Sequence, residues 1–174
     1  MRTGVKVELS RDDKAAIGLP SCPRWEIDLV ACKPATGELL ALECKSYLDS
    51  GGVHAAHFDP GSRLAGRYKL FNKPELRGVV LERLRTQMIE SGLCRPEANP
   101  KLGLIYAHAT SHNERRLAER FEAEGWLRFG PDWIRNRLGN LAEAGYENSV
   151  AAIVAKLLLR NERMAREPVA SQIC

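Results

Sequence analysis

Residues 25–46, WEIDLVACKPATGELLALECKS, decide the fold of this chain because they indicate two strands joined by a short turn. Apolar and polar side chains alternate over 25–33, as they do in a strand with one buried face. The residues from Pro34 to Gly37 have turn chemistry, and a second, more apolar strand is predicted over 38–47. The stretch therefore predicts a β-hairpin.

Three charged residues lie where this hairpin is otherwise apolar. Glu43 and Lys45 are two residues apart in the second strand, so their side chains share a face. A turn that pairs Lys33 with Glu38 also places Asp28 opposite Glu43, because each cross-strand pair sums to the same number. Two facing carboxylates with side-chain carbons about 5 Å apart repel one another unless a cation lies between them.

This charged cluster has two open interpretations. One is a divalent metal site, because Mg²⁺ takes one or two carboxylates together with waters and phosphate oxygens. Lys45 would then orient or deprotonate a water, or stabilise charge on a phosphate. The other is an ordinary salt-bridged face of a solvated sheet. The apolar run 39–42 indicates a sheet covered on both sides, where unpaired ions are expensive, but the spacing alone favours neither interpretation.

The remaining chain predicts an α/β protein with a mixed central sheet flanked by helices. Gln87 is expected to face solvent on its helix, and Arg115, Arg116 and Arg120 are expected to pair with glutamates of their own helix. The expected strands cover 5–10, 101–109 and the short GWLRF stretch, the expected helices cover 72–92 and 112–125, and a C-terminal helical pair meets near Gly145.

Composition bounds the architecture and the partners. The 174 residues suit one core domain, predicted over 1–125, with a helical extension over 126–164 packed on it and a tail over 165–174. A net charge of +4 permits a nucleic-acid partner without demonstrating one. Five scattered cysteines without a CxxC pair predict a reducing, cytoplasmic location, and no apolar run is long enough to predict a membrane helix. The apolar helix 149–160 needs a covering surface, either the sheet or a second copy in a homodimer.

The hairpin, with Asp28 in its first strand and Glu43-Cys44-Lys45 in its second, resembles the core of the PD-(D/E)xK nuclease superfamily. It is similar to the restriction-endonuclease-like and resolvase-like members, and the order of elements matches their βββαβα core through about residue 125. The resemblance implies that Asp28 and Glu43 bind Mg²⁺ or Mn²⁺ and that the Cys44 backbone carbonyl completes the ligands. It also implies that Lys45 acts on the attacking water and that the reaction hydrolyses phosphodiester bonds of DNA.

The residues after Lys45 are the predicted substrate-binding residues of this nuclease interpretation. The loop over 48–63 is rich in glycine and histidine and has no periodicity, so it is expected to be functional or mobile. Residues at its start are predicted to approach a phosphate with their backbone amides: Asp49, Ser50, Gly51 and Gly52. Ser46, just before the loop, is a further predicted substrate-binding residue.

Other interpretations stay open beside the nuclease. Many members add a glutamate from a helix before the first strand, whereas here only Glu8 is available. That departure favours a catalytically inactive nuclease-fold protein that binds DNA or another protein, and a metal-free interaction domain is the third possibility. The pairs His54/His57 and His108/His112 are expected to be loop and strand-end residues rather than zinc ligands.

Overall fold

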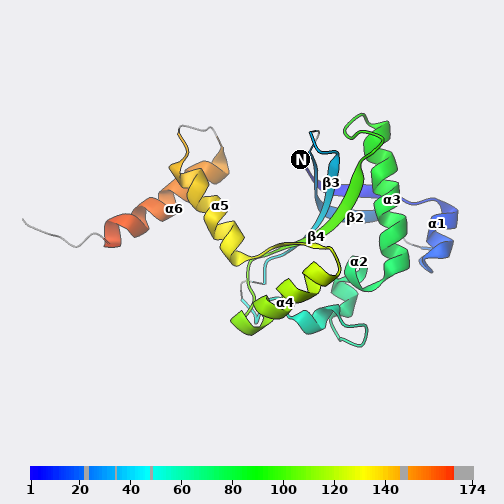
Figure 1. The fold of residues 1–174 in the computed structure, drawn as a ribbon, viewed down its shortest axis with the longest axis horizontal. Helices are drawn as coiled ribbons and strands as arrows, with labels where there is room; N and C mark the ends of the chain where they lie inside the picture. The colour runs from blue at the N-terminus through cyan, green and yellow to red at the C-terminus, as the bar shows by residue number, and fades with distance from the viewer. Residues whose placement is uncertain (22–23, 34, 48, 146–148, 167–174) are drawn as a thin grey trace, which may run out of the picture. The chain divides into compact units, whose positions relative to one another are not determined.

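The computed structural model describes residues 1–21, 24–33, 35–47, 49–145 and 149–166 (Figure 1). The chain divides into two compact units, Met1–Gly130 and Pro131–Cys174. The second unit contains α5 (Pro131–Glu143) and α6 (Val150–Arg166), which pack on one another, with Ala152 and Ala155 buried. The predicted helical pair is therefore confirmed, while most of the predicted tail, from residue 167 onward, lies outside the described residues.

The first unit is built on a five-stranded mixed sheet flanked by helices, which confirms the predicted α/β class with a mixed sheet (Figure 1). The strands follow one another across the sheet in chain order. The first three are antiparallel neighbours, and the fourth and fifth run parallel to the third. Their bounds are β1 (Arg2–Glu8), β2 (Arg24–Lys33), β3 (Glu38–Lys45), β4 (Asn99–Tyr106) and β5 (Leu127–Phe129).

The two long helices of the first unit lie where the periodicity predicts them. α3 (Pro74–Glu90) contacts β1 and β4, and α4 (Ser111–Ala123) contacts η1 (Ala55–Phe58) and β5. The predicted helix 72–92 corresponds to α3, which follows the short α2 (Lys69–Asn72). A proline lies in the first turn of α3, as predicted. The helical elements of the first unit are α1 (Arg11–Ala16), η1 (Ala55–Phe58), η2 (Ala65–Arg67), α2 (Lys69–Asn72), α3 (Pro74–Glu90) and α4 (Ser111–Ala123).

The hairpin register confirms the count made from the turn. Lys33 pairs with Glu38, and the ladder continues residue by residue to Leu29 opposite Leu42. Pro34 itself lies outside the described residues. The ladder ends there, one position before Asp28 and Glu43, so the direct pairing of these two residues stays a prediction.

The segment 49–63 differs from the aperiodic loop that the sequence suggests. It contains η1, and Val53, Ala55 and Phe58 are all buried in the core. The Phe58 ring lies edge-on to Phe121, with 5.2 Å between ring centroids. Hydrophobic burial of three side chains at irregular spacing fixes this segment, and a search for a single period cannot detect such a pattern.

Three polar expectations are wrong because side chains reach across elements. Gln87 does not face solvent: its amide donates to the Lys6 carbonyl at 3.1 Å, and its oxygen accepts from the backbone of β1. Arg120 pairs with Asp59 outside its own helix, and its guanidinium also donates to the Phe58 carbonyl at 2.6 Å. Glu114 pairs with Arg128 at 2.6 Å instead of with a residue of α4. Contacts set by the tertiary fold replace the local i,i+4 pairs.

No helix within the described ranges is both long enough and apolar enough to cross a membrane.

Gly52 supplies the first stability prediction. It has a φ of 79° and bridges to Ala109, and a Cβ added there would lie 2.3 Å from the His108 carbonyl oxygen. Replacing Gly52 with alanine is therefore expected to destabilise the protein by about 2 kcal/mol or more, measured by urea unfolding.

The matched control is Gly78→Ala in the interior of α3, where an added Cβ meets nothing within 4 Å. This variant is expected to stabilise the protein by about 0.5–1 kcal/mol, because alanine has the higher helix propensity. Equal effects of the two substitutions would contradict the packing described for Gly52.

Candidate functional site

The charged end of β3 continues the buried face of that strand. Leu39 and Ala41 are fully buried, and by the alternation of side chains Glu43 and Lys45 follow them on the same face. Only 14% of the Glu43 side chain and 19% of the Lys45 side chain are exposed to solvent. The Lys45 ammonium lies 3.1 Å from a Glu43 carboxylate oxygen. An ion pair thus lies where the apolar core reaches the end of the sheet.

Asp28 joins this site through the backbone of the neighbouring strand. The β2–β3 ladder ends at Leu29 and Leu42, one position before Asp28. There the Asp28 Oδ2 atom accepts the backbone N–H of Cys44 at 2.7 Å. The carboxylate therefore provides the hydrogen bond that a strand carbonyl would otherwise supply, and it fixes Asp28 beside Glu43.

Burial and charge act against one another at Glu43. Burial is the largest influence and raises the pKa of this carboxyl, and the nearby Asp28 carboxylate raises it further. The Lys45 ammonium lowers the pKa of Glu43 but does not cancel the effect of burial. A divalent cation would favour the charged form of both carboxylates, so the protein alone leaves this pair under-neutralised.

The donor set of the site consists of two carboxylates. Within the described residues, no three His, Cys, Asp or Glu side chains group together as metal ligands. Asp28 and Glu43 each use one oxygen for the bonds above, and no hydrogen bond from the described residues reaches the second oxygen of either. Two carboxylate oxygens are hard donors of the kind that Mg²⁺ or Mn²⁺ takes.

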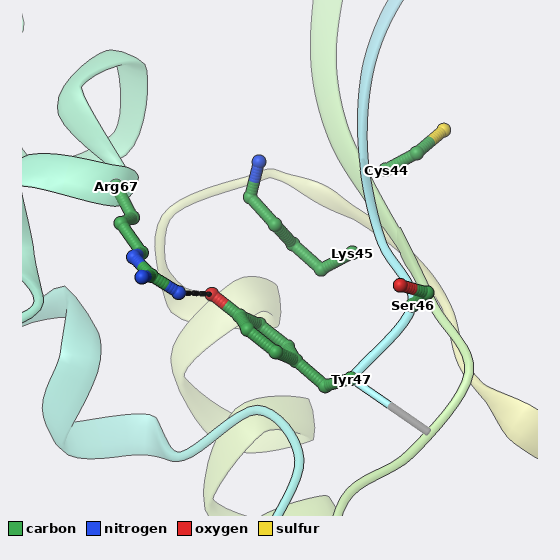
Figure 2. A pocket seen from close by; sticks show the side chains of 5 residues that line it. All are labelled: Cys44, Lys45, Ser46, Tyr47 and Arg67. Carbon is green, nitrogen blue, oxygen red and sulfur yellow. Dashed lines mark hydrogen bonds between the residues drawn. The ribbon is translucent and has the colours of Figure 1, made fainter. Parts of the chain in front are cut away.

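The Cys44 side chain is separate from this donor set. Burial and the Asp28 carboxylate raise the pKa of the thiol, so it stays protonated at neutral pH and is poorly suited to bind a metal as thiolate. Figure 2 shows its sulfur directed away from Lys45. The role predicted for Cys44 concerns its backbone carbonyl, and that role stays a prediction.

A cavity of about 370 Å³ opens beside the carboxylates, lined by Cys44, Lys45, Ser46, Tyr47 and Arg67. In Figure 2 the side chains of Lys45, Tyr47 and Arg67 converge from β3, from the residues after it and from η2. Arg67 donates to the Tyr47 hydroxyl at 3.5 Å. One side of the site is thus acidic and the adjoining cavity is basic.

Tyr47 occupies a conformation that side chains rarely adopt, with a φ of 43°. Such backbone strain costs of the order of 1 kcal/mol and is concentrated at functional sites. Burial acts to raise the pKa of Tyr47, but the hydrogen bond from Arg67, the nearby Tyr68 hydroxyl and the positive charges together lower it. Tyr47 is therefore positioned by its backbone turn and polarised by Arg67.

Tyr68 is buried next to Lys45 and does not itself line the cavity. Its side chain is only 1% exposed, and the Lys45 ammonium lies 5.9 Å from its ring centroid. Its hydroxyl makes no hydrogen bond of normal geometry with a described residue, but it is close enough to the Tyr47 hydroxyl to interact with it. Burial, with the neighbouring Tyr47 and Glu43, raises the pKa of Tyr68 strongly, so the phenol stays protonated. Tyr68 therefore packs against Lys45 and interacts with Tyr47.

Two of the histidines predicted to be loop residues, His54 and His57, lie next to Tyr68. The His54 and His57 rings are 4.9 Å apart, and the His57 Nδ1 atom accepts the backbone N–H of His54. His57 stacks on Tyr68 at 5.5 Å. Burial, then the positive charges of His54 and Arg67, lower the pKa of His57, so its ring is neutral at physiological pH. The His57 ring therefore packs against Tyr68, and its Nδ1 atom is not free to bind a metal in this arrangement.

The predicted substrate-binding residues occupy the turn that follows β3. Ser46 lines the cavity, whereas Asp49, Ser50 and Gly51 are exposed on the adjacent turn. The Ser50 backbone N–H donates to the Tyr47 carbonyl at 3.4 Å, which closes this turn. Their contact with a phosphate stays a prediction.

Sequence reasoning did not find Tyr47, Arg67 or Tyr68. Tyr47 follows the ExK triplet by two residues, so continued alternation past Lys45 could have suggested it. Arg67 and Tyr68 lie in a segment without strand or helix periodicity, and the fold alone brings them to Lys45. No local signal in the sequence marks them.

With this geometry described, comparison with known proteins adds no identification: no protein-family model, curated protein or solved structure matches the chain.

Two glutamates of β3 give a matched pH test. The pKa of Glu43 is raised above its ordinary value of 4.5, so its contribution to stability is present below pH 4.5 and lost as the pH rises. Glu43→Gln is therefore expected to raise the melting temperature near pH 8, with the gain shrinking toward pH 4, as thermal unfolding across pH would show.

Glu38 has the opposite sign on the same strand. Hydrogen bonds from Lys101 and Lys33 lower its pKa from 4.5 to about 2, so its contribution is present above pH 4.5 and lost as the pH falls toward about 2. Glu38→Gln is expected to lower the melting temperature near pH 8. A loss from Glu43→Gln equal to that from Glu38→Gln would contradict the electrostatics described for Glu43.

Proposed function

We propose that this protein is a divalent-metal-dependent phosphodiesterase that hydrolyses DNA. The observation that carries the proposal is the convergence of Asp28, Glu43 and Lys45 at the end of β3, with the Lys45 ammonium 3.1 Å from Glu43. Two carboxylates that share one lysine, beside a basic cavity, are groups that metal-dependent hydrolysis of a phosphodiester uses.

Each residue has a distinct task. Asp28 and Glu43 would hold the metal through their second oxygens, with the Cys44 backbone carbonyl as the further ligand. Bound there, Mg²⁺ or Mn²⁺ would lower the pKa of a water ligand and draw negative charge from the phosphate oxygens. Asp28 also keeps its hydrogen bond to the Cys44 N–H, so the same side chain would orient the end of the strand and bind the metal.

Lys45 acts on the reacting phosphate and water. Its ammonium is held between Glu43 and the Tyr68 ring, and this fixes the position of one positive charge at the mouth of the cavity. In the net reaction the water oxygen bonds to phosphorus, the bond from phosphorus to the leaving oxygen breaks, and one water proton passes to that oxygen. Lys45 orients the water and stabilises the charge that grows on the phosphate oxygens.

The order of elements gives independent support. Leaving out the short helices α1, η1, η2 and α2 and the last strand β5, the first unit runs β1, β2, β3, α3, β4, α4, which is the βββαβα order of the PD-(D/E)xK nuclease superfamily that the hairpin resembles. DNA as the substrate and the cytoplasm as the location both come from this interpretation of the chain.

A specific observation favours a second candidate, a catalytically inactive nuclease-fold protein that binds DNA. Many members of the superfamily add a glutamate from a leading helix, but here the candidate Glu8 lies on β1. Its carboxylate pairs with Arg24 at 3.0 Å, on the strand pair at the sheet edge. A site with only two carboxylates could therefore bind DNA without cleaving it.

Cleavage assays decide between the two candidates. With Mg²⁺ or Mn²⁺, wild-type protein is expected to nick plasmid or branched DNA, and EDTA is expected to abolish the reaction. Asp28→Asn keeps an acceptor for the Cys44 N–H but loses the negative charge, so cleavage should fall at least about a hundredfold while the fold is retained. Lys45→Met should cause a comparable loss.

Arg95→Gln is the matched control, because Arg95 is exposed in the loop that leads to the other end of β4. Its cleavage rate should stay within about twofold of wild type. Undiminished cleavage by Asp28→Asn would rule out the assigned site, whereas metal-independent DNA binding without any cleavage would favour the second candidate.

A further inference from the structure

We propose that Arg67 and Tyr47, together with Lys45, form a subsite that binds a backbone phosphate of nucleic acid next to the carboxylate pair. The proposal rests on the proposed function for the identity of the ligand as nucleic acid. It assigns a task to two residues outside the Asp28, Glu43 and Lys45 set, and binding at this subsite is measurable without cleavage.

Arg67 brings a positive charge that the protein does not neutralise. Within the described part of the chain its guanidinium has no carboxylate partner, and its hydrogen bond goes to the Tyr47 hydroxyl at 3.5 Å. Other arginines of this unit are neutralised by a carboxylate, as Arg83 is by Asp13 at 2.6 Å and Arg128 by Glu114 at 2.6 Å. An exposed guanidinium aimed into a cavity presents several donors that match phosphate oxygens.

Tyr47 adds a neutral donor to the same lining. Its hydroxyl accepts from Arg67, so its own proton can be donated to a ligand. The Tyr68 hydroxyl does not line the cavity and interacts with the Tyr47 hydroxyl instead. A phosphate oxygen in the cavity would therefore accept from both Arg67 and Tyr47.

Charge decides which ligand suits this cavity. Its lining contributes the Lys45 and Arg67 cations and no carboxylate, whereas Asp28 and Glu43 lie on the adjoining side of Lys45. The volume of about 370 Å³ exceeds that of one phosphate group, and the cavity is open, as passage of a continuing chain requires. An anion with further atoms on both sides, such as a phosphodiester of nucleic acid, fits these features.

A purely structural role is the alternative for Arg67. The guanidinium could serve only to hold Tyr47 in its strained backbone conformation, with a φ of 43°. Such a role would affect stability and leave the salt dependence of DNA binding unchanged. Because a phosphate contact releases counterions, the slope of log affinity against log salt separates the two roles.

The experiment measures binding of a fluorescein-labelled 20-base-pair duplex by anisotropy, in EDTA so that no cleavage occurs, over a series of NaCl concentrations. Arg67→Gln is expected to weaken binding about tenfold at 0.1 M salt and to make the slope less negative by about 0.9, the value for one lost phosphate contact. Arg95→Gln is the matched control, because Arg95 is exposed in the loop that leads to the other end of β4. It should change the affinity by less than twofold.

Tyr47→Phe provides the second variant. It removes the hydroxyl that accepts from Arg67 and keeps the partly buried ring, so the melting temperature should change little. Duplex affinity should nevertheless fall about threefold to tenfold, through the lost hydrogen bond to phosphate. A purely structural residue would not combine unchanged stability with weakened binding.

The outcomes separate this proposal from the proposed hydrolysis. Identical slopes and affinities for wild type, Arg67→Gln and Arg95→Gln would overturn the subsite, whatever the cleavage assays show. Weaker binding by Arg67→Gln with a smaller slope would support the subsite, even for a wild-type protein that fails to cleave DNA. In the latter case the proposed hydrolysis would fail and the phosphate subsite would stand.

Discussion

The hydrogen bond from the Cys44 backbone N–H to the Asp28 carboxylate is the contact on which the site depends. It forms where the β2–β3 ladder stops, so it joins the two strands at the position where their backbones no longer pair. Because it fixes Asp28 against β3, it also fixes the distance between Asp28 and Glu43. The turn at the other end of the hairpin sets the register of the two strands, and this hydrogen bond holds the Asp28 carboxylate at the end of β3.

The fold carries an electrostatic cost at this place. Glu43 follows two fully buried residues of β3, and burial raises its pKa in spite of the Lys45 ion pair. Glu38, at the solvated start of the same strand, has a strongly lowered pKa. One strand therefore holds a carboxylate that stabilises the fold and another that opposes it, as is expected where function and stability compete.

Much of the first unit follows from local patterns in the sequence. The alternation over residues 25–33, the turn and the helix with apolar residues from Leu76 to Met88 each predict an element that the structure contains. The register of the hairpin follows from the turn alone, which is why Asp28, Glu43 and Lys45 could be grouped before any coordinates. Period and turn chemistry act within a few residues, and these features depend on little else.

The basic half of the site lies beyond such patterns. Arg67 and Tyr68 come more than twenty residues after Lys45 and reach it through the burial of Val53, Ala55 and Phe58, which follow no regular period. Similarly, Gln87 and Arg120 find their partners on β1 and at Asp59, at distances in the chain that helix spacing cannot indicate. Packing of irregular segments decides these contacts, and packing is a property of the whole unit.

Crystals soaked in Mn²⁺ and measured at an X-ray wavelength where manganese scatters anomalously would test the central claim most directly. We expect one strong anomalous peak within about 2.5 Å of carboxylate oxygens of both Asp28 and Glu43, and no such peak for Asp28→Asn under the same conditions. A manganese peak elsewhere, or none at a concentration that occupies ordinary carboxylate sites, would contradict the assignment of this carboxylate pair as a metal site.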